Sequence, residues 1–233
     1  MLDTVMDSYL LSLLQLCDSN LPIGAFSHSF GLETYIQDEK VVNKQTFAAW
    51  LKIYVRGQLV HSDGLACKLT YEAMVRCELD KIWNLDQMIT VQSFARETRE
   101  GNYRMGERMI QLGMELYDIP TLALYQDRVK AKQSYGHPAI TYAIIAHHLQ
   151  IPQSTAILSH LYSCISSLVQ NGVRGIPLGQ TDGQRLLQEI QYHLLEAQRL
   201  IEGLSEDDFG IVSPGIELSQ MRHEQLHFRL FMS

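Results

Sequence analysis

Hydrophobic residues along most of this chain recur every three or four positions, the spacing of an α-helix with one buried face. The clearest example follows Asp182 and contains Leu186, Leu187, Ile190, Leu194, Ala197, Leu200, Ile201 and Leu204. The pattern predicts a helix that Asp182 caps and that ends near Gly203. No segment alternates apolar and polar residues with turn signals at hairpin spacing. We therefore predict an all-α protein.

Proline, glycine and asparagine divide the apolar pattern into about eight to ten helices. The predicted helices cover residues 5–17, 27 or 29–37, 43–55, 62–73, 80–117 as two helices broken near 92–95, 138–148, 152–172 and 182–204. Asn43 is the expected N-cap of the third, Ser62 restarts a helix, and Pro138 is the expected first residue of its helix. Residues 175–179 are expected to be irregular.

We predict two regions, a single helical bundle over residues 1–204 and a C-terminal tail over residues 205–233. The tail begins with the acidic run Ser205–Asp208. Its last residues include large apolar side chains, namely Met221, Leu226, Phe228, Leu230 and Phe231. Because a chain end frays unless something holds it, these side chains favour a tail ordered by a partner. Packing of the tail on its own core is the open alternative.

Composition narrows the class of protein. The chain has 233 residues, of which 46% are hydrophobic and 19% charged, which is typical of a globular protein. Its net charge of -7 gives no general attraction to phosphate backbones or anionic lipids, so neither nucleic acid nor a membrane is an expected partner. Asp3 and Asp7 near the start argue against a secretory signal, and we expect a cytoplasmic protein.

The cysteines and histidines form no complete metal-binding pattern. Cys17, Cys67, Cys77 and Cys164 are irregularly spaced, and each is interpreted as a small buried residue. His223 and His227 are four apart, a helical ligand spacing, but two ligands make at best a weak site. We predict no metal site and no cofactor.

The glycine-rich turn at residues 22–31 contains Ser27, His28 and Ser29. A helix precedes it and no lysine follows, so it is not a phosphate-binding loop, and it lacks the Gly-x-Ser-x-Gly of a nucleophile elbow. We favour a tight turn whose serine hydroxyls cap a helix, and the alternative is an exposed contact surface that includes Phe26 and Phe30. A small hydrolase using Ser27, His28 or His137 is the rival enzymatic interpretation.

Two further segments have both a plain and a functional interpretation. The charged stripe from Arg96 to Arg108 is either a solvated helix face or a docking face whose arginines contribute to a nucleotide site in another protein. The Gly/Pro loop at residues 171–184 is either an interhelical turn or a junction that lines a subunit interface or an internal passage.

Four segments, in the same order, resemble the UreF family of urease accessory proteins. They are DSNLPIGAFSHSFGLE at residues 18–33, RETR at 96–99 followed by Gly106, RGIPLGQTDGQ at 174–184, and QMRHEQL at 220–226 with RLFMS at 229–233. One departure is Met232, where some members have a basic residue. The similarity covers nearly the whole chain.

The resemblance implies an all-helical protein that dimerises and is required for nickel insertion into apo-urease. It implies binding to the accessory protein UreD, also called UreH, and to the GTPase UreG, with no catalytic residue in this chain. The alternatives are a GTPase-activating protein with an arginine finger and a free nickel-binding metallochaperone that uses His223 and His227.

The resemblance also suggests three sets of binding residues. The face for the GTPase consists of Pro22, Gly24, Phe26, Ser29, Arg96, Glu97 and Arg99. The dimer junction or passage consists of Arg174, Gly175, Gln180 and Asp182. The tail set for the UreD-type partner, in helix-in-groove fashion, consists of Met221, His223, Leu226, Phe228, Leu230 and Phe231.

Overall fold

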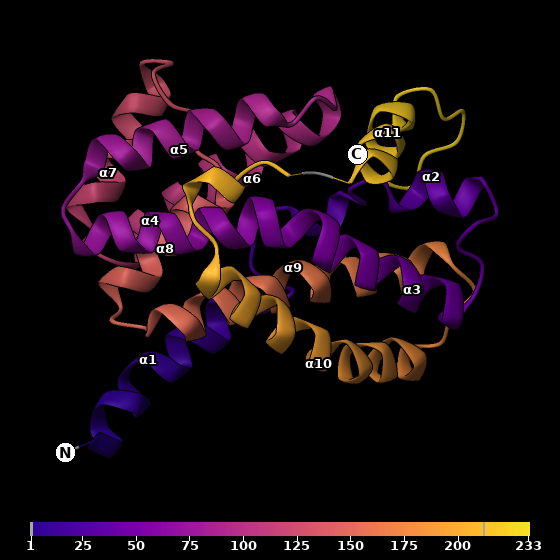
Figure 1. Cartoon of the computed structure of the whole chain (residues 1–233), viewed down its shortest axis with the longest axis horizontal. Helices are drawn as coiled ribbons and strands as arrows, with labels where there is room; N and C mark the ends of the chain where they lie inside the picture. Colours follow the sequence, from indigo (N-terminus) through magenta and orange to yellow (C-terminus); the bar gives the residue numbers. More distant parts are fainter. Residues whose placement is uncertain (1, 212) are drawn as a thin grey trace.

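The computed structural model describes residues 2–211 and 213–233, with side chains from Tyr9 onward. Within these residues the chain forms eleven α-helices, of which α3 and α4 are joined into one by a π-helix, and no strand, which confirms the all-α prediction (Figure 1). The α-helices are α1 (Leu2–Leu16), α2 (Leu32–Gln37), α3 (Lys44–Tyr54), α4 (Leu65–Val75), α5 (Leu79–Gln92), α6 (Arg96–Leu116), α7 (Pro120–Lys130), α8 (Pro138–His148), α9 (Gln153–Gly175), α10 (Gln180–Gly203) and α11 (Pro214–His223). The other helical elements are the 3-10 helices η1 (Ala25–Ser27) and η3 (Glu206–Asp208) and the π-helix η2 (Val55–Gly64).

Helix α8 lies at the centre of the bundle, with α4, α6 and α9 packed around it. Every side chain from Ala139 to Ala146 is buried, because this helix is apolar on all sides. Pro138 is its first residue, as predicted, and His137 caps it by accepting a hydrogen bond from the Ala139 N–H. Burial of a side chain such as Ile144 stabilises the fold by about 1.5–3 kcal/mol.

Helices α3, η2 and α4 form one continuous helix that crosses the molecule (Figure 1). Asn43 caps it through a capping box with Thr46, which confirms the predicted cap. The predicted restart at Ser62 is wrong. The Ser62 hydroxyl donates to the Gln58 carbonyl oxygen, 2.8 Å away, within the same helix, so it does not cap a new one.

Helices α9 and α10 pack against each other and are joined by an irregular link at residues 176–179, as predicted, whereas Gly175, also predicted to be irregular, is the last residue of α9. Helix α10 begins at Gln180 with Gly179 as its N-cap, so the predicted capping role of Asp182 is wrong. Asp182 lies in the first turn, where a carboxylate complements the helix dipole, and it pairs with Arg185. Leu200, predicted on the buried face of α10, is exposed.

Helix α7 lies in a stretch where the apolar spacing predicted no element. Only Leu122 and Tyr125 of this helix are buried, so its pattern is too sparse for periodicity to reveal it. Pro120 begins the helix, which is a favourable position for proline.

The two ends of the chain pack differently against the rest of the helical bundle, which we call the body. The N-terminal part of α1 projects from the body (Figure 1), and its Leu10, Leu11 and Leu14 are exposed. After α10 the chain crosses the face seen in Figure 1 and ends beside α2, where α11 packs against α2 and α6. The division into residues 1–204 and a partner-ordered tail stays a prediction. No helix among the described residues is long and apolar enough to cross a membrane.

Candidate functional site

The last residues of the chain are bound to the glycine-rich turn near its beginning. The Met232 N–H donates to the Ser27 carbonyl oxygen at 2.7 Å, and the Ser29 N–H donates to the Ser233 carbonyl oxygen. His28 Nδ1 lies 2.8 Å from the Ser233 hydroxyl. We call this region the terminal junction. It comprises residues 22–33, the start of α6, the end of α9 and residues 214–233.

A buried ionic cluster lies at the centre of the terminal junction. The His223 side chain is fully buried between two carboxylates, with Nε2 2.9 Å from Glu33 and Nδ1 2.6 Å from Glu97. The second Glu97 oxygen accepts from Arg229, and Glu33 also accepts the N–H groups of Leu230 and Phe231. Three elements, α2, α6 and α11, therefore share one set of charge-assisted hydrogen bonds.

The charged forms of His223 and Glu33 stabilise each other. Burial acts to lower the pKa of His223, but its hydrogen bonds to Glu33 and Glu97 outweigh burial and raise that pKa above its ordinary value. Burial acts to raise the pKa of Glu33, and the hydrogen bonds from His223 and from the Leu230 and Phe231 N–H groups lower it on balance. The cluster therefore stabilises an imidazolium between carboxylates.

Two exposed ion pairs surround the cluster. Arg222 binds Asp38 through both guanidinium nitrogens at 2.8 and 3.0 Å. The hydrogen bonds from Arg222 and from Lys40 lower the pKa of Asp38 to about 2. Arg96 at the start of α6 pairs with Glu224 at 2.9 Å. The tail is thus tied to α2 and α6 by contacts on its surface as well as in its interior.

Helices α6 and α9 complete the junction around His28. A Cβ atom at Gly101 would lie 2.6 Å from His28 Cε1, so only glycine permits α6 to approach this ring. Asn171 donates to the His28 carbonyl oxygen at 2.7 Å. Burial, followed by the charges of Arg104 and His223, lowers the pKa of His28 to about 4, so this ring is neutral beside the charged cluster. Sequence reasoning did not identify Gly101, because its importance depends on a ring 73 positions away.

Arg174 connects the end of α9 with both ends of the chain. Its guanidinium donates to the Phe26 carbonyl oxygen at 3.0 Å and lies 5.1 Å from the centre of the Phe231 ring. A Cβ atom at Gly175 would contact Ile36 and Phe231. Two residues predicted for a dimer junction or passage thus lie in the terminal junction.

The structure distributes the predicted binding residues between surface and interior. In the set predicted for the GTPase, Pro22, Phe26 and Arg96 are exposed, Gly24 is half-buried, Ser29 is buried, and Glu97 belongs to the ionic cluster. Arg99 donates to the carbonyl oxygens of Ser93 and Phe94. In the tail set, Met221, Phe228 and Leu230 are exposed, Leu226 is half-buried, and His223 and Phe231 are buried.

Gln180 and Asp182 are not brought to the terminal junction by any hydrogen bond among the described residues. Both lie in the first turn of α10, where Asp182 bonds with Gly179 and Arg185. The late glycine-rich loop is therefore divided between two places, with Arg174 and Gly175 in the junction and its second half on α10.

Two rival sets of chemical residues are not assembled within the described part of the chain. Helix α11 ends at His223, whose two ring nitrogens bind Glu97 and Glu33, so His227 lies beyond the helix and the predicted ligand spacing is lost. Ser27, His28 and His137 share no hydrogen bond, and His137 is the N-cap of α8.

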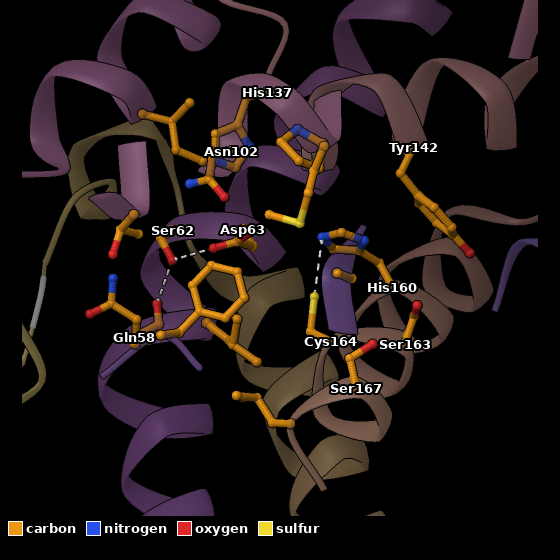
Figure 2. A pocket seen from close by; sticks show the side chains of 18 of the residues that line it. Gln58, Ser62, Asp63, Asn102, His137, Tyr142, His160, Ser163, Cys164 and Ser167 are labelled. Atoms are coloured by element: carbon orange, nitrogen blue, oxygen red, sulfur yellow. Dashed lines mark hydrogen bonds between the residues drawn. The ribbon is translucent and has the colours of Figure 1, made fainter. Parts of the chain in front are cut away.

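A second candidate site is an interior cavity of about 110 Å³. Asp63 of η2 and His160 and Cys164 of α9 point toward one another in it (Figure 2). Their donor atoms all lie within 4.8 Å, and Cys164 Sγ is 3.8 Å from His160 Nε2. These are the residues that could hold a metal ion.

Burial favours the neutral forms of the His160 imidazole and the Cys164 thiol. Burial lowers the pKa of His160 to about 4 and raises the pKa of Cys164 well above its ordinary value. Sequence reasoning interpreted His160 as an ordinary histidine and Cys164 as a small buried residue. The spacing of four on one helix was the available signal. The same interpretation is wrong for Cys77, which is exposed.

Comparison with known proteins agrees with the resemblance seen in the sequence. The model of the UreF family matches residues 41–191. A urease accessory protein UreF of Lachnoclostridium phytofermentans is 58% identical over 228 residues, which cover 98% of this chain and 100% of that protein. A protein of the same name from Bacillus sp. strain TB-90 is 54% identical over 224 residues, covering 96% of this chain and 99% of that protein. On this evidence the chain belongs to the UreF family of urease accessory proteins.

Proposed function

We propose that this protein is a docking component of cytoplasmic urease maturation, required for nickel insertion into apo-urease and without catalysis of its own. It binds a UreD-type accessory protein through its tail and recruits and regulates a UreG-type GTPase through the neighbouring turn and α6. The observation that carries the proposal is a set of exposed apolar side chains in a tail that a buried ionic cluster holds in place. Met221, Phe228, Leu230 and Met232 are exposed in the same tail whose His223 is buried in the ionic cluster.

Preorganisation makes this surface suitable for binding. Contacts that fix the tail before association reduce the entropy that a partner must offset. Phe228 is 86% exposed, although the Leu230 and Phe231 N–H groups that follow it are bound to Glu33. Large side chains presented from an ordered backbone are the usual source of binding energy at protein interfaces.

Recruitment of the GTPase is the preferred role for the face formed by Phe26 and the first turn of α6. An arginine finger must reach into a partner's active site. The Arg96 guanidinium is paired with Glu224, and the Arg99 guanidinium binds backbone carbonyls, so both arginines serve to shape this surface. The proposed homodimer finds support in the exposed leucines of α1, which leave an apolar helix face uncovered.

The first test is capture of the purified UreD-type partner and the GTPase by the full-length chain. Phe228→Glu and Leu230→Glu should each weaken capture of the UreD-type partner at least tenfold, because both place a charge in an apolar contact. The matched control is Tyr192→Glu on α10, an aromatic residue that is 65% exposed and distant from the tail in sequence. Equal capture by the Phe228, Leu230 and control variants would contradict the tail assignment.

Arg99→Glu tests the face for the GTPase. We expect it to reduce GTPase recruitment while the UreD-type partner is still captured. Unchanged recruitment would argue against this face. GTP hydrolysis measured with the isolated chain tests the non-catalytic role, which any turnover above the buffer rate would refute.

A further inference from the structure

The geometry of the interior cavity points to a binding site that the terminal junction does not explain. We propose that Asp63, His160 and Cys164 bind one divalent transition-metal ion of the nickel, cobalt and zinc class. One carboxylate oxygen, one imidazole nitrogen and one thiolate sulfur would be its protein ligands. We call these three residues the cavity cluster.

Secondary structure places the three donors around one point. His160 and Cys164 are four residues apart on α9 and therefore lie on the same helix face (Figure 2). Asp63 faces them from η2. In a tetrahedral site, metal–sulfur and metal–nitrogen bonds of about 2.3 and 2.0 Å place the two ligand atoms about 3.5 Å apart. The Cys164 Sγ to His160 Nε2 distance of 3.8 Å is close to this spacing.

The chemistry of the ligands selects the class of metal. Magnesium and calcium prefer sites made of oxygen atoms, whereas thiolate and imidazole favour later divalent transition metals. The Ser62 hydroxyl oxygen lies 2.9 Å from the Asp63 carboxylate, and its single proton is shared between this carboxylate and the Gln58 carbonyl oxygen, which helps to orient the carboxylate. The set is therefore suited to nickel, cobalt or zinc.

The rest of the cavity leaves room for further ligands. A volume of about 110 Å³ accommodates an ion with several water molecules. Two lining polar atoms, Gln58 Oε1 and Thr98 Oγ1, are buried and have no hydrogen-bond partner in the described protein. Buried polar atoms normally have partners, which water bound in the cavity would supply. Three protein ligands with an open position are typical of an exchangeable site, whereas structural zinc sites usually have four protein ligands.

The cavity reaches the terminal junction. Ile23 and Ala25 of the N-terminal turn and Gln220 of α11 line it together with the cavity cluster. An ion held by the cluster thus lies behind the surface that we assign to partner binding. The identity of the ion as nickel rests on the proposed role in urease maturation, but the site itself does not.

The test is a titration of the full-length chain, without partners, with Co²⁺. We expect one ion per chain and a thiolate-to-cobalt charge-transfer band in the near ultraviolet, and Ni²⁺ should displace the cobalt. Cys164→Ser should abolish the band, whereas Cys77→Ser, which changes an exposed cysteine, should retain it. Circular dichroism verifies that each variant is folded.

Asp63→Asn provides a second variant, because Asp63 is only half-buried and the change keeps its size. It should weaken cobalt affinity at least tenfold. His227→Ala, which changes an exposed tail histidine, should leave the affinity unchanged. Absence of stoichiometric binding, or a band that survives Cys164→Ser, would overturn the site. Because the titration uses no partner, it can fail while partner capture succeeds, and the two proposals are distinguishable.

Discussion

Helices α8 and α11 have similar lengths, eleven and ten residues, but different interactions hold them in place. All the buried side chains of α8 are apolar except Thr141 and the hydroxyl of Tyr142. The buried residues of α11 are Ile216, Glu217, Ser219, Gln220 and His223, only one of which is apolar. The body therefore depends on hydrophobic burial, and the tail depends on hydrogen bonds and charges.

This difference has a physical consequence. Hydrophobic burial is non-directional and does not depend on protonation. A buried ionic cluster stabilises only while every partner is present and correctly charged, because each missing partner leaves an uncompensated group. We therefore expect the tail to detach under conditions in which the body stays folded, so the surface that it carries can be lost by local opening.

The largest effect on stability should come from a substitution in the body. Ile144→Ala removes a fully buried side chain at the centre of α8 and should lower the free energy of unfolding by about 2–5 kcal/mol. Urea denaturation measures it, and all regions of the body should unfold with the same reduced midpoint. A loss confined to the tail would contradict the central role of α8.

His223→Ala should have the next largest effect, confined to the tail. The change leaves the Glu33 and Glu97 carboxylates without their shared partner, at a cost of about 1–3 kcal/mol. Hydrogen exchange should show faster exchange in residues 214–233 and little change in α8. His227→Ala is the matched control, since that side chain is exposed. If both variants exchange alike, the ionic cluster does not hold the tail.

The attachment of the tail should also depend on pH in both directions. The pKa of His223 is raised above 6.5, so its contribution is complete below pH 6.5 and is lost as pH rises through the higher value in the folded protein. The pKa of Glu33 is lowered below 4.5, so its contribution is complete above pH 4.5 and is lost as pH falls through the lower folded value. The tail should therefore be most protected between about pH 4.5 and 6.5.

Limited proteolysis of the tail across this pH range measures the effect. Other groups belong to the same environment, since Glu97 and Arg229 bind within the cluster. The neutral His28 ring also lies in the terminal junction, and burial together with the charges of Arg104 and His223 lowers its pKa. His223→Gln should remove the loss on the alkaline side. A wild-type profile that stays flat above pH 6.5 would show that His223 is not charged in the folded tail.

The smallest effect on the attachment of the tail should come from the loss of a surface ion pair. Arg222→Ala removes an exposed ion pair with Asp38, and such pairs contribute little because water and salt screen them. We expect tail exchange close to that of the wild type at moderate salt, well below the effect of His223→Ala. A comparable effect would mean that the surface pairs, and not the buried cluster, anchor the tail.

Local features of this protein were predictable from its sequence, because they depend on neighbouring residues. Asn43 caps α3, Pro138 begins α8, and the break between α5 and α6 lies at residues 93–95. The errors arose where a residue of a type that often caps a helix lies inside one. Ser62 bonds within a continuous helix, and Asp182 lies inside the first turn of α10.

Most segments of the terminal junction were also recognised in the sequence, but the cavity cluster was not, and neither were the contacts that assemble the two sites. His223 binds Glu97 and Glu33 across 126 and 190 positions, and Asp63 faces His160 and Cys164 from a separate helix. No local pattern encodes such distances, because packing of the whole bundle decides which helix faces meet. The sequence by itself determined most of the helices and the family, whereas the tertiary structure decided that the tail closes on the N-terminal turn and that Asp63, His160 and Cys164 share one cavity.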